Sequence, residues 1–155
     1  RAGTSLAACA AQAVEQAGAR AAQRRVTLQL REEGVALRGP WDAELLTLAL
    51  SCLIDNAIDF SPDGAVVRVD VAGRRVTVRD HGPGVPDDQL PHLAQPFYRP
   101  DAARERATGG VGLGLYLCKL VAQAHGGELR IRRAEPGLEV AMVWTPAPAA
   151  QRGMP

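Results

Sequence analysis

The sequence predicts an α+β fold in which a mostly antiparallel sheet carries its helices on one face. One observation is a long segment, from Asp42 to Phe60, whose apolar residues recur at helical spacing. The other is a set of short runs that alternate between apolar and polar residues, as strands do: 66–71, 76–78, 128–133 and 138–144. With 155 residues and 46% hydrophobic content, we expect one domain over 1–146 and a loose Pro- and Ala-rich tail at 147–155.

The first forty residues predict one helix and two short strands. Residues 5–24 are rich in Ala and Gln, and Thr4 or Ser5 can cap the start of a helix. Residues 26–31 alternate in polarity, and a second short run follows at 35–38. We expect these two runs to form a hairpin or the edge of a meander.

The segment from Asp42 to Phe60 is the clearest helix in the chain. Its apolar positions form one stripe: Leu45, Leu46, Ala49, Leu50, Leu53, Ile54, Ala57 and Ile58. The sequence Ser-Pro-Asp-Gly at 61–64 ends the run, because proline cannot continue a helix.

The second half of the chain predicts a hairpin, a long loop, a helix and two closing strands. The runs 66–71 and 76–78 flank a turn and suit an antiparallel pair. Residues 86–108 are polar, with only a short helix expected near 87–93, and a long irregular segment of this kind is usually a functional loop. Glycines then open a helix that ends near His125.

Composition excludes several classes of function. Eighteen basic and seventeen acidic residues give a net charge of +1, so we expect no nucleic-acid partner. The three cysteines, Cys9, Cys52 and Cys118, are scattered, and their spacing fits neither a disulfide framework nor a zinc site. No stretch approaches the roughly 18 to 20 apolar residues of a membrane span, and we expect a soluble fragment without a secretion signal.

Four segments carry residues that suit nucleotide chemistry. They are Leu-Ile-Asp-Asn-Ala-Ile-Asp-Phe-Ser-Pro at 53–62, Asp-His-Gly-Pro-Gly at 80–84, Gln-Pro-Phe-Tyr-Arg-Pro at 95–100 and Gly-Gly-Val-Gly-Leu-Gly-Leu at 109–115. Taken alone, each has an ordinary structural explanation as an exposed helix side, a turn or a charged loop. Their order and the elements on which they fall argue together for one site.

The second segment suits the recognition of adenine. A carboxylate such as Asp80 at a strand end can accept a hydrogen bond from the adenine amino group, whereas guanine has a carbonyl oxygen there. Gly82 and Gly84 allow the backbone to turn tightly beside the base.

The fourth segment suits the binding of phosphate. Glycines before a helix expose backbone N–H groups, and the helix N-terminus adds partial positive charge. It lacks the preceding strand and later acidic residue of a dinucleotide-binding fold, and also the Gly-Lys-Ser/Thr ending of a Walker loop.

Together the four segments resemble the ATP-binding catalytic domain of bacterial two-component sensor histidine kinases, within the gyrase, Hsp90, histidine kinase and MutL ATPase superfamily. The resemblance covers about residues 45–127. It implies a two-layer α/β sandwich of the Bergerat type, with a mixed, mostly antiparallel sheet, helices on one face and a mobile ATP lid.

The resemblance also implies roles for individual residues. Asn56 would hold Mg²⁺ through its amide oxygen, and Arg99 would reach the terminal phosphates, so these two are the expected catalytic residues. Besides Asn56, the expected ATP contacts are Phe60, Asp80, Gly82, Gly84, Phe97, Tyr98, Gly110, Val111, Gly112, Leu113 and Gly114.

Four positions depart from the family pattern. Cys52 stands where a further asparagine is common, Ala94 replaces an aromatic residue before the lid, and Val111 replaces a threonine or serine. Asp59 replaces a basic residue that reaches a phosphate, and its charge would repel the nucleotide unless magnesium or an arginine screens it.

The resemblance implies a protein-histidine kinase that uses ATP and Mg²⁺. Its γ-phosphoryl group would pass to a histidine on a dimerisation helix absent from this fragment, and then to a response regulator. The intact protein would be a homodimer, and this domain the cytoplasmic portion of an inner-membrane sensor. The histidines present, His81, His92 and His125, are not followed by an acidic residue and are poor phosphoacceptor candidates.

Three alternatives share the fold. A gyrase- or MutL-type ATPase is disfavoured, since Cys52 stands where such enzymes have a water-activating glutamate. A serine/threonine kinase of the anti-sigma type stays open, as does a non-catalytic interaction module that has lost ATP.

Overall fold

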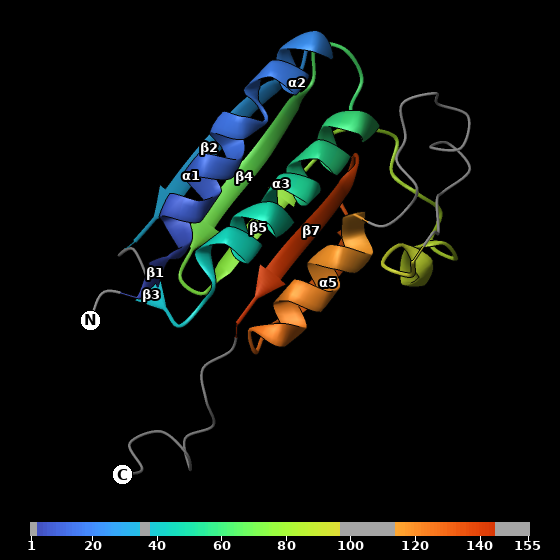
Figure 1. Ribbon diagram of the computed structural model, residues 1–155. Coiled ribbons are helices and arrows are strands. Elements are labelled where there is room, and N and C mark those ends of the chain that lie inside the picture. The colour runs from blue at the N-terminus through green and yellow to red at the C-terminus, as the bar shows by residue number, and fades with distance from the viewer. Residues whose placement is uncertain (1–2, 35–37, 97–113, 145–155) are drawn as a thin grey trace.

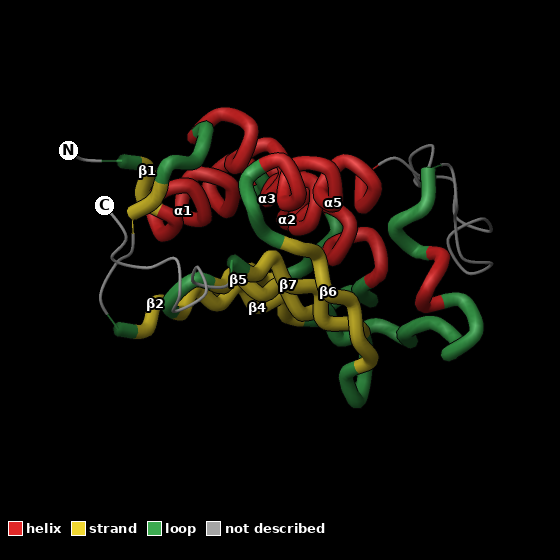
Figure 2. The backbone as a smooth tube through the Cα atoms, turned by 90° about the horizontal axis from the view of Figure 1, so that it is seen from below, coloured by secondary structure: helices red, strands yellow, loops and turns green. Residues whose placement is uncertain are grey.

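The computed structural model describes residues 3–34, 38–96 and 114–144 as a two-layer α+β domain. A five-stranded sheet with the order β2-β4-β5-β7-β6 forms one layer, and all the α-helices lie on one of its faces (Figures 1 and 2). The predicted fold class is confirmed. The helices are α1 (Leu6–Gln16), α2 (Gly18–Gln23), α3 (Ala43–Phe60) and α5 (Gly114–Ala124). The strands are β1 (Thr4–Ser5), β2 (Thr27–Glu33), β3 (Arg38–Gly39), β4 (Val66–Ala72), β5 (Arg75–Arg79), β6 (Glu128–Arg133) and β7 (Leu138–Val143).

The pairing of β2 corrects the sequence analysis. β2 runs parallel to β4, with Thr27 opposite Val66, while β3 pairs antiparallel with β1 through Arg38 and Ser5. The expected hairpin of 26–31 with 35–38 is therefore wrong, although β2 does lie at the sheet edge. Parallel strands need a crossover connection, and α3 provides it between β2 and β4 while covering the sheet. Residues 35–37 lie outside the described residues.

The N-terminal helical segment is divided in two. Ser5 caps α1 as predicted, because its hydroxyl accepts a hydrogen bond of 3.1 Å from the backbone N–H of Ala8. The segment breaks at Ala17, and α2 starts at Gly18, a residue of low helix propensity. The break lets α2 turn toward the C-terminal end of α3.

α3 is the central helix of the helical layer and lies between α1 and α5 (Figure 1). It begins as predicted after Asp42, whose carboxylate accepts a hydrogen bond of 3.0 Å from the N–H of Leu45. Its buried stripe meets the inward side chains of the sheet: Leu46, Leu50, Leu53, Ile54 and Ile58 are at most 2% exposed. The C-terminal end of this well-anchored helix carries the first predicted motif.

The remaining strands follow the prediction to within one residue at each end. β4 and β5 form the expected antiparallel pair, and β6 pairs with β7 in the same sense. The short helix expected near 87–93 is a single 3₁₀ turn, Leu90–His92. Leu93 after that turn is buried, with Ala94 packed against the same core.

His125 joins the C-terminal end of α5 to the N-terminal end of α3. Its Nδ1 lies 2.7 Å from the carbonyl oxygen of Val121, and its Nε2 accepts a 3.1 Å hydrogen bond from the N–H of Asp42. The imidazole therefore connects the last turn of α5 to the start of α3. Beside it the rings of Trp41 and Trp144 pack with centroids 5.1 Å apart.

Within the described ranges, no helix combines the length and the apolar character needed to cross a membrane. The expected tail at 147–155 lies outside the described residues.

Candidate functional site

The structure brings together the end of β5 and the end of α3. Asp80 follows β5 directly, and Gly82 packs against the carbonyl oxygen of Phe60, the last residue of α3. A Cβ atom on Gly82 would lie 2.0 Å from that oxygen, so only glycine fits there. Three residues from two separate motifs thus share one site: Phe60, Asp80 and Gly82.

Asp80 is buried and only one of its oxygens is engaged by the described residues. Its Oδ1 accepts hydrogen bonds from the backbone N–H groups of Gly82 at 2.9 Å and Leu138 at 3.2 Å. The residue is 4% exposed. Burial raises the pKa of this carboxyl group, and the two backbone hydrogen bonds oppose the shift. Among the described residues nothing donates a hydrogen bond to Oδ2, which is left to accept one from a ligand.

A second glycine turn supports Asp80 from the other side. Gly137 has a φ of +94°, and a Cβ there would lie 2.2 Å from the carbonyl oxygen of Asp80. Gly84, with a φ of +75°, lies against the backbone of Gly137. Sequence reasoning missed Gly137, although the Pro-Gly pair just before a strand is a turn signal that could have indicated it.

Asn56 lies on α3, one turn before Phe60, and is half-buried. Its amide makes no hydrogen bond with any described residue, so its oxygen is available as a ligand. Burial raises the pKa of the adjacent Asp55, helped by the charge of Asp59 and opposed by Arg20. In the described part of the chain, no group of three or more His, Cys, Asp or Glu side chains could hold a metal.

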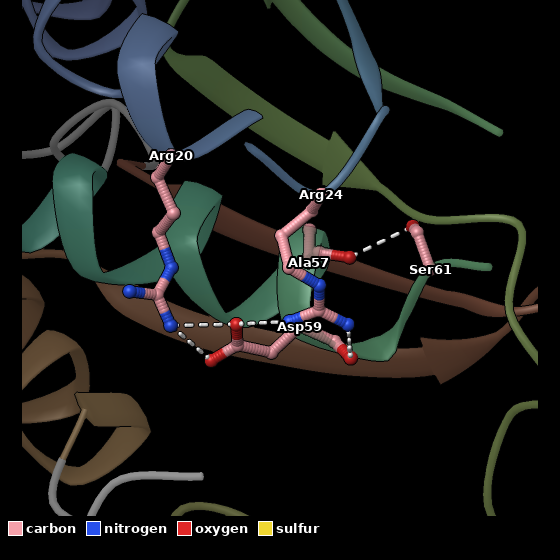
Figure 3. A network of polar contacts seen from close by, with 5 residues as sticks. All are labelled: Arg20, Arg24, Ala57, Asp59 and Ser61. Atoms are coloured by element: carbon pink, nitrogen blue, oxygen red, sulfur yellow. Dashed lines mark hydrogen bonds and ion pairs between the residues drawn. The ribbon is translucent and has the colours of Figure 1, made fainter. Parts of the chain in front are cut away.

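Asp59 is paired with two arginines, Arg20 on α2 and Arg24 directly after it (Figure 3). Its two carboxylate oxygens accept hydrogen bonds of 2.6 and 2.8 Å from one guanidinium nitrogen of Arg20. Arg24 donates to the same carboxylate at 3.1 Å and to the Asp59 carbonyl oxygen at 3.4 Å. Of the two conditions named above for Asp59, the structure shows the pairing with arginine, and the pairs also connect α2 to the end of α3.

Ser61 ends α3 beside this network. Its hydroxyl donates a 2.8 Å hydrogen bond to the carbonyl oxygen of Ala57 and is buried (Figure 3). This bond satisfies one of the carbonyl groups left open at a helix end.

The model of the histidine kinase-, DNA gyrase B- and HSP90-like ATPases matches residues 41–149, more than half of the chain. The chain belongs to this family. The predicted resemblance is confirmed, and the family matches the two-layer fold described above.

Curated relatives of this histidine kinase-like ATPase domain are sensor kinases. It is 38% identical over 130 residues to sensor histidine kinase YkoH of Bacillus subtilis, covering 83% of this chain and 28% of YkoH. It is 40% identical over 120 residues to sensor protein QseC of Salmonella typhimurium, covering 77% of this chain and 26% of QseC. A solved structure, that of the mycobacterial sensor histidine kinase MprB, superposes with a TM-score of 0.78 at 25% identity, covering 91% of this chain and 95% of that chain. The chain thus spans about a quarter of the curated relatives' length.

Two of the family's segments fall largely outside the described residues of this ATPase domain. The expected contacts in that part are Phe97, Tyr98, Arg99, Gly110, Val111, Gly112 and Leu113. Gly114 is described: it begins α5 and faces Cys52 on α3, since a Cβ on Gly114 would lie 3.9 Å from the Cβ of Cys52.

Two of the three histidines hold backbone groups of the domain. His81 Nδ1 lies 2.7 Å from the carbonyl oxygen of Val66, and His125 joins α5 to α3 as described above. His92 is exposed, with Nδ1 3.2 Å from the side-chain oxygen of Gln95. That the three histidines are poor phosphoacceptor candidates stays a prediction.

Proposed function

We propose that this domain binds Mg-ATP and donates its γ-phosphoryl group to a histidine outside these 155 residues, as the catalytic part of a two-component sensor histidine kinase. The observation that carries the proposal is Asp80. A buried carboxylate is costly unless its oxygens accept hydrogen bonds. Here Oδ1 accepts two from backbone N–H groups, and Oδ2 accepts none from the described residues.

The geometry of Asp80 suits adenine. With Oδ1 fixed by Gly82 and Leu138, the carboxylate cannot rotate without breaking two hydrogen bonds. Oδ2 therefore presents a fixed acceptor, which the exocyclic amino group of adenine matches and the carbonyl oxygen of guanine does not. Phe60, whose carbonyl oxygen lies against Gly82 at the end of α3, would pack beside the base.

Asn56 fits the role of a single protein ligand for magnesium. Mg²⁺ binds hard oxygen ligands, keeps several waters and takes further ligands from substrate phosphates. An amide oxygen without a hydrogen bond inside the described residues, with no carboxylate cluster around it, suits that chemistry. When bound, the ion would neutralise charge on the phosphates.

The glycine segment at 109–115 and Arg99 would bind the phosphates, a proposal that rests on the sequence. Gly114, at the start of α5, lies beside Cys52 on α3, and Cys52 is one helical turn before Asn56. A helix N-terminus at that place would favour the negative charge of a phosphate.

The phosphoacceptor is assigned to another part of the protein. His81 and His125 are engaged with backbone groups, and the chain spans about a quarter of its curated relatives. The proposal also includes three properties of the intact protein. It would be a homodimer, it would transfer the phosphoryl group to a response regulator, and this domain would be the cytoplasmic part of a membrane-bound sensor.

The relatives favour this function over the alternatives. Those reported above are named as sensor histidine kinases or sensor proteins, and none as an anti-sigma serine/threonine kinase. The screening of Asp59 by Arg20 and Arg24 also removes one reason to regard the domain as unable to bind nucleotide.

Calorimetric titration of ATP with and without Mg²⁺ tests the proposal. We expect magnesium to strengthen ATP binding to the unchanged domain, and Asn56→Ala to remove that gain while weak metal-free binding persists. Gly18→Ala, in open space on α2, is the matched control and should bind like the unchanged domain. Absence of heat, together with no displacement of a fluorescent adenine nucleotide, would leave a non-catalytic interaction module as the better account.

A further inference from the structure

We propose that Cys52 and Cys118 form a redox modification site, at which a hydroperoxide converts the two thiols into a reversible disulfide between α3 and α5. The two helices pack side by side in the helical layer (Figure 1). Each contributes one cysteine to their shared interface, and neither cysteine has a role in the function proposed above.

The contacts of Cys118 place both thiols at that interface. Cys118 is fully buried, and its sulfur lies 3.1 Å from the carbonyl oxygen of Ala49 on α3. Cys52 lies three residues after Ala49, on the same side of α3. The thiol of Cys118 also lies close enough to Cys52 to influence its pKa.

A second contact fixes the position of Cys52. Its Cβ would lie 3.9 Å from a Cβ on Gly114, and Gly114 is one helical turn before Cys118 on α5. Cys52 therefore faces two successive turns of α5. Cys9 differs: its sulfur lies 3.8 Å from the carbonyl oxygen of Ala43, and it has no thiol partner within the described residues.

The two thiols differ in reactivity in the way that such a pair requires. The hydrogen bond from Cys118 lowers the pKa of Cys52, which is only half-buried. The same bond, together with burial, raises the pKa of Cys118. Because Cys52 is the more exposed of the two, an oxidant reaches its sulfur first, and the buried Cys118 thiol then resolves the oxidised form.

The reaction balances with a hydroperoxide as the oxidant. The Cys52 thiolate attacks the peroxide O–O bond and becomes a sulfenic acid, while the alkoxide or hydroxide that leaves takes up a proton. The Cys118 sulfur then attacks the Cys52 sulfur, its proton joins the departing hydroxide, and water is released. Two thiols and one hydroperoxide give one disulfide, one alcohol or water, and one further water.

The bond would act on the site next to it, and this consequence rests on the proposed function. A disulfide holds its sulfurs about 2.0 Å apart, closer than hydrogen-bonded thiols, so the facing turns of α3 and α5 must shift. Asn56 lies one turn beyond Cys52, and Gly114 begins α5. We expect the oxidised domain to bind ATP about fivefold more weakly or worse, the lower end of coupling between linked sites.

The test treats the full 155-residue chain with hydrogen peroxide, then alkylates it in denaturant and maps the peptides. We expect the loss of two hydrogen atoms, protection of two of the three thiols, a Cys52–Cys118 linked peptide and complete reversal by dithiothreitol. Cys9→Ser, the matched control, should behave like the unchanged chain. Cys52→Ser, at the half-buried position, should keep its fold and lose the cross-link.

Other outcomes would overturn the proposal. These are a disulfide that includes Cys9, or oxidation of Cys52 to a sulfinic acid without any cross-link. Peptide mapping of the unchanged chain decides this even if Cys118→Ser does not fold. ATP binding is measured separately on the reduced chain: failure there refutes the nucleotide function and leaves the thiol result standing. A cross-linked chain that binds ATP like the reduced one refutes the coupling.

Discussion

Replacing Asp80 by asparagine should convert an acceptor for adenine into a donor without unfolding the domain. Two backbone N–H groups, from Gly82 and Leu138, point at Oδ1 of Asp80. An asparagine must place its carbonyl oxygen at that point, because its amide nitrogen cannot accept those hydrogen bonds. The NH₂ group then occupies the place of Oδ2 and meets the amino group of adenine, which is also a donor.

The size of the effect follows from the bond that is lost. A hydrogen bond to a charged group contributes about 1.5–3 kcal/mol, so ATP should bind Asp80→Asn roughly 10- to 150-fold more weakly. The two backbone hydrogen bonds persist, and a buried charge is removed, so the free energy of unfolding should change by no more than about 1 kcal/mol. Asp80→Ala, in contrast, would leave two buried donors unsatisfied and cost about 1–3 kcal/mol for each.

Calorimetry with ATP and GTP, together with thermal unfolding, measures both effects. We expect the ratio of ATP to GTP affinity to fall in Asp80→Asn, since the new NH₂ group can donate to the guanine carbonyl oxygen. Asp87→Asn makes the same chemical change at an exposed ion pair with Arg133 and should leave the ratio unchanged. If Asp80→Asn keeps its melting temperature and binds ATP as tightly as the unchanged domain, the carboxylate does not read adenine.

Three further predictions rest on the same contacts. Burial raises the pKa of Asp80 above 3.8, so ATP affinity should fall as the pH drops through that raised pKa. Over the same pH interval the stability of the unliganded domain should decrease with rising pH, since the carboxyl group ionises first in the unfolded chain. Calorimetry at several pH values should show neither change in Asp80→Asn. Gly82→Ala places a Cβ 2.0 Å from the Phe60 carbonyl oxygen and should lower the free energy of unfolding, measured in urea, by about 3 kcal/mol or more. Gly18→Ala, in open space, should raise it by about 0.5–1 kcal/mol. Equal stabilities of the two variants would contradict the close packing at Gly82. Asp59→Asn weakens two partly exposed ion pairs and should lower the free energy of unfolding by about 1–2 kcal/mol, a value between those typical of exposed and of buried ion pairs. A change indistinguishable from zero would show that these pairs do not hold α2 in place.

The sequence alone determined the elements whose signals are local. The helix after Asp42 and the hairpin of β4 and β5 were predictable, because helical periodicity, strand alternation, caps and turn residues act within a few positions of each other. The placement of Asp80 at a strand end and the need for Gly82 beside it were also predictable, since both belong to one short motif.

Only the tertiary structure decided which distant residues meet. The parallel pairing of β2 with β4 replaced the expected hairpin, because alternation marks a strand without naming its partner. The N–H of Leu138 donates to the carboxylate of Asp80, 58 positions away, and Arg20 and Arg24 form ion pairs with Asp59. Such contacts depend on how α3 and its neighbours pack over the sheet, and no local pattern in the sequence encodes that geometry.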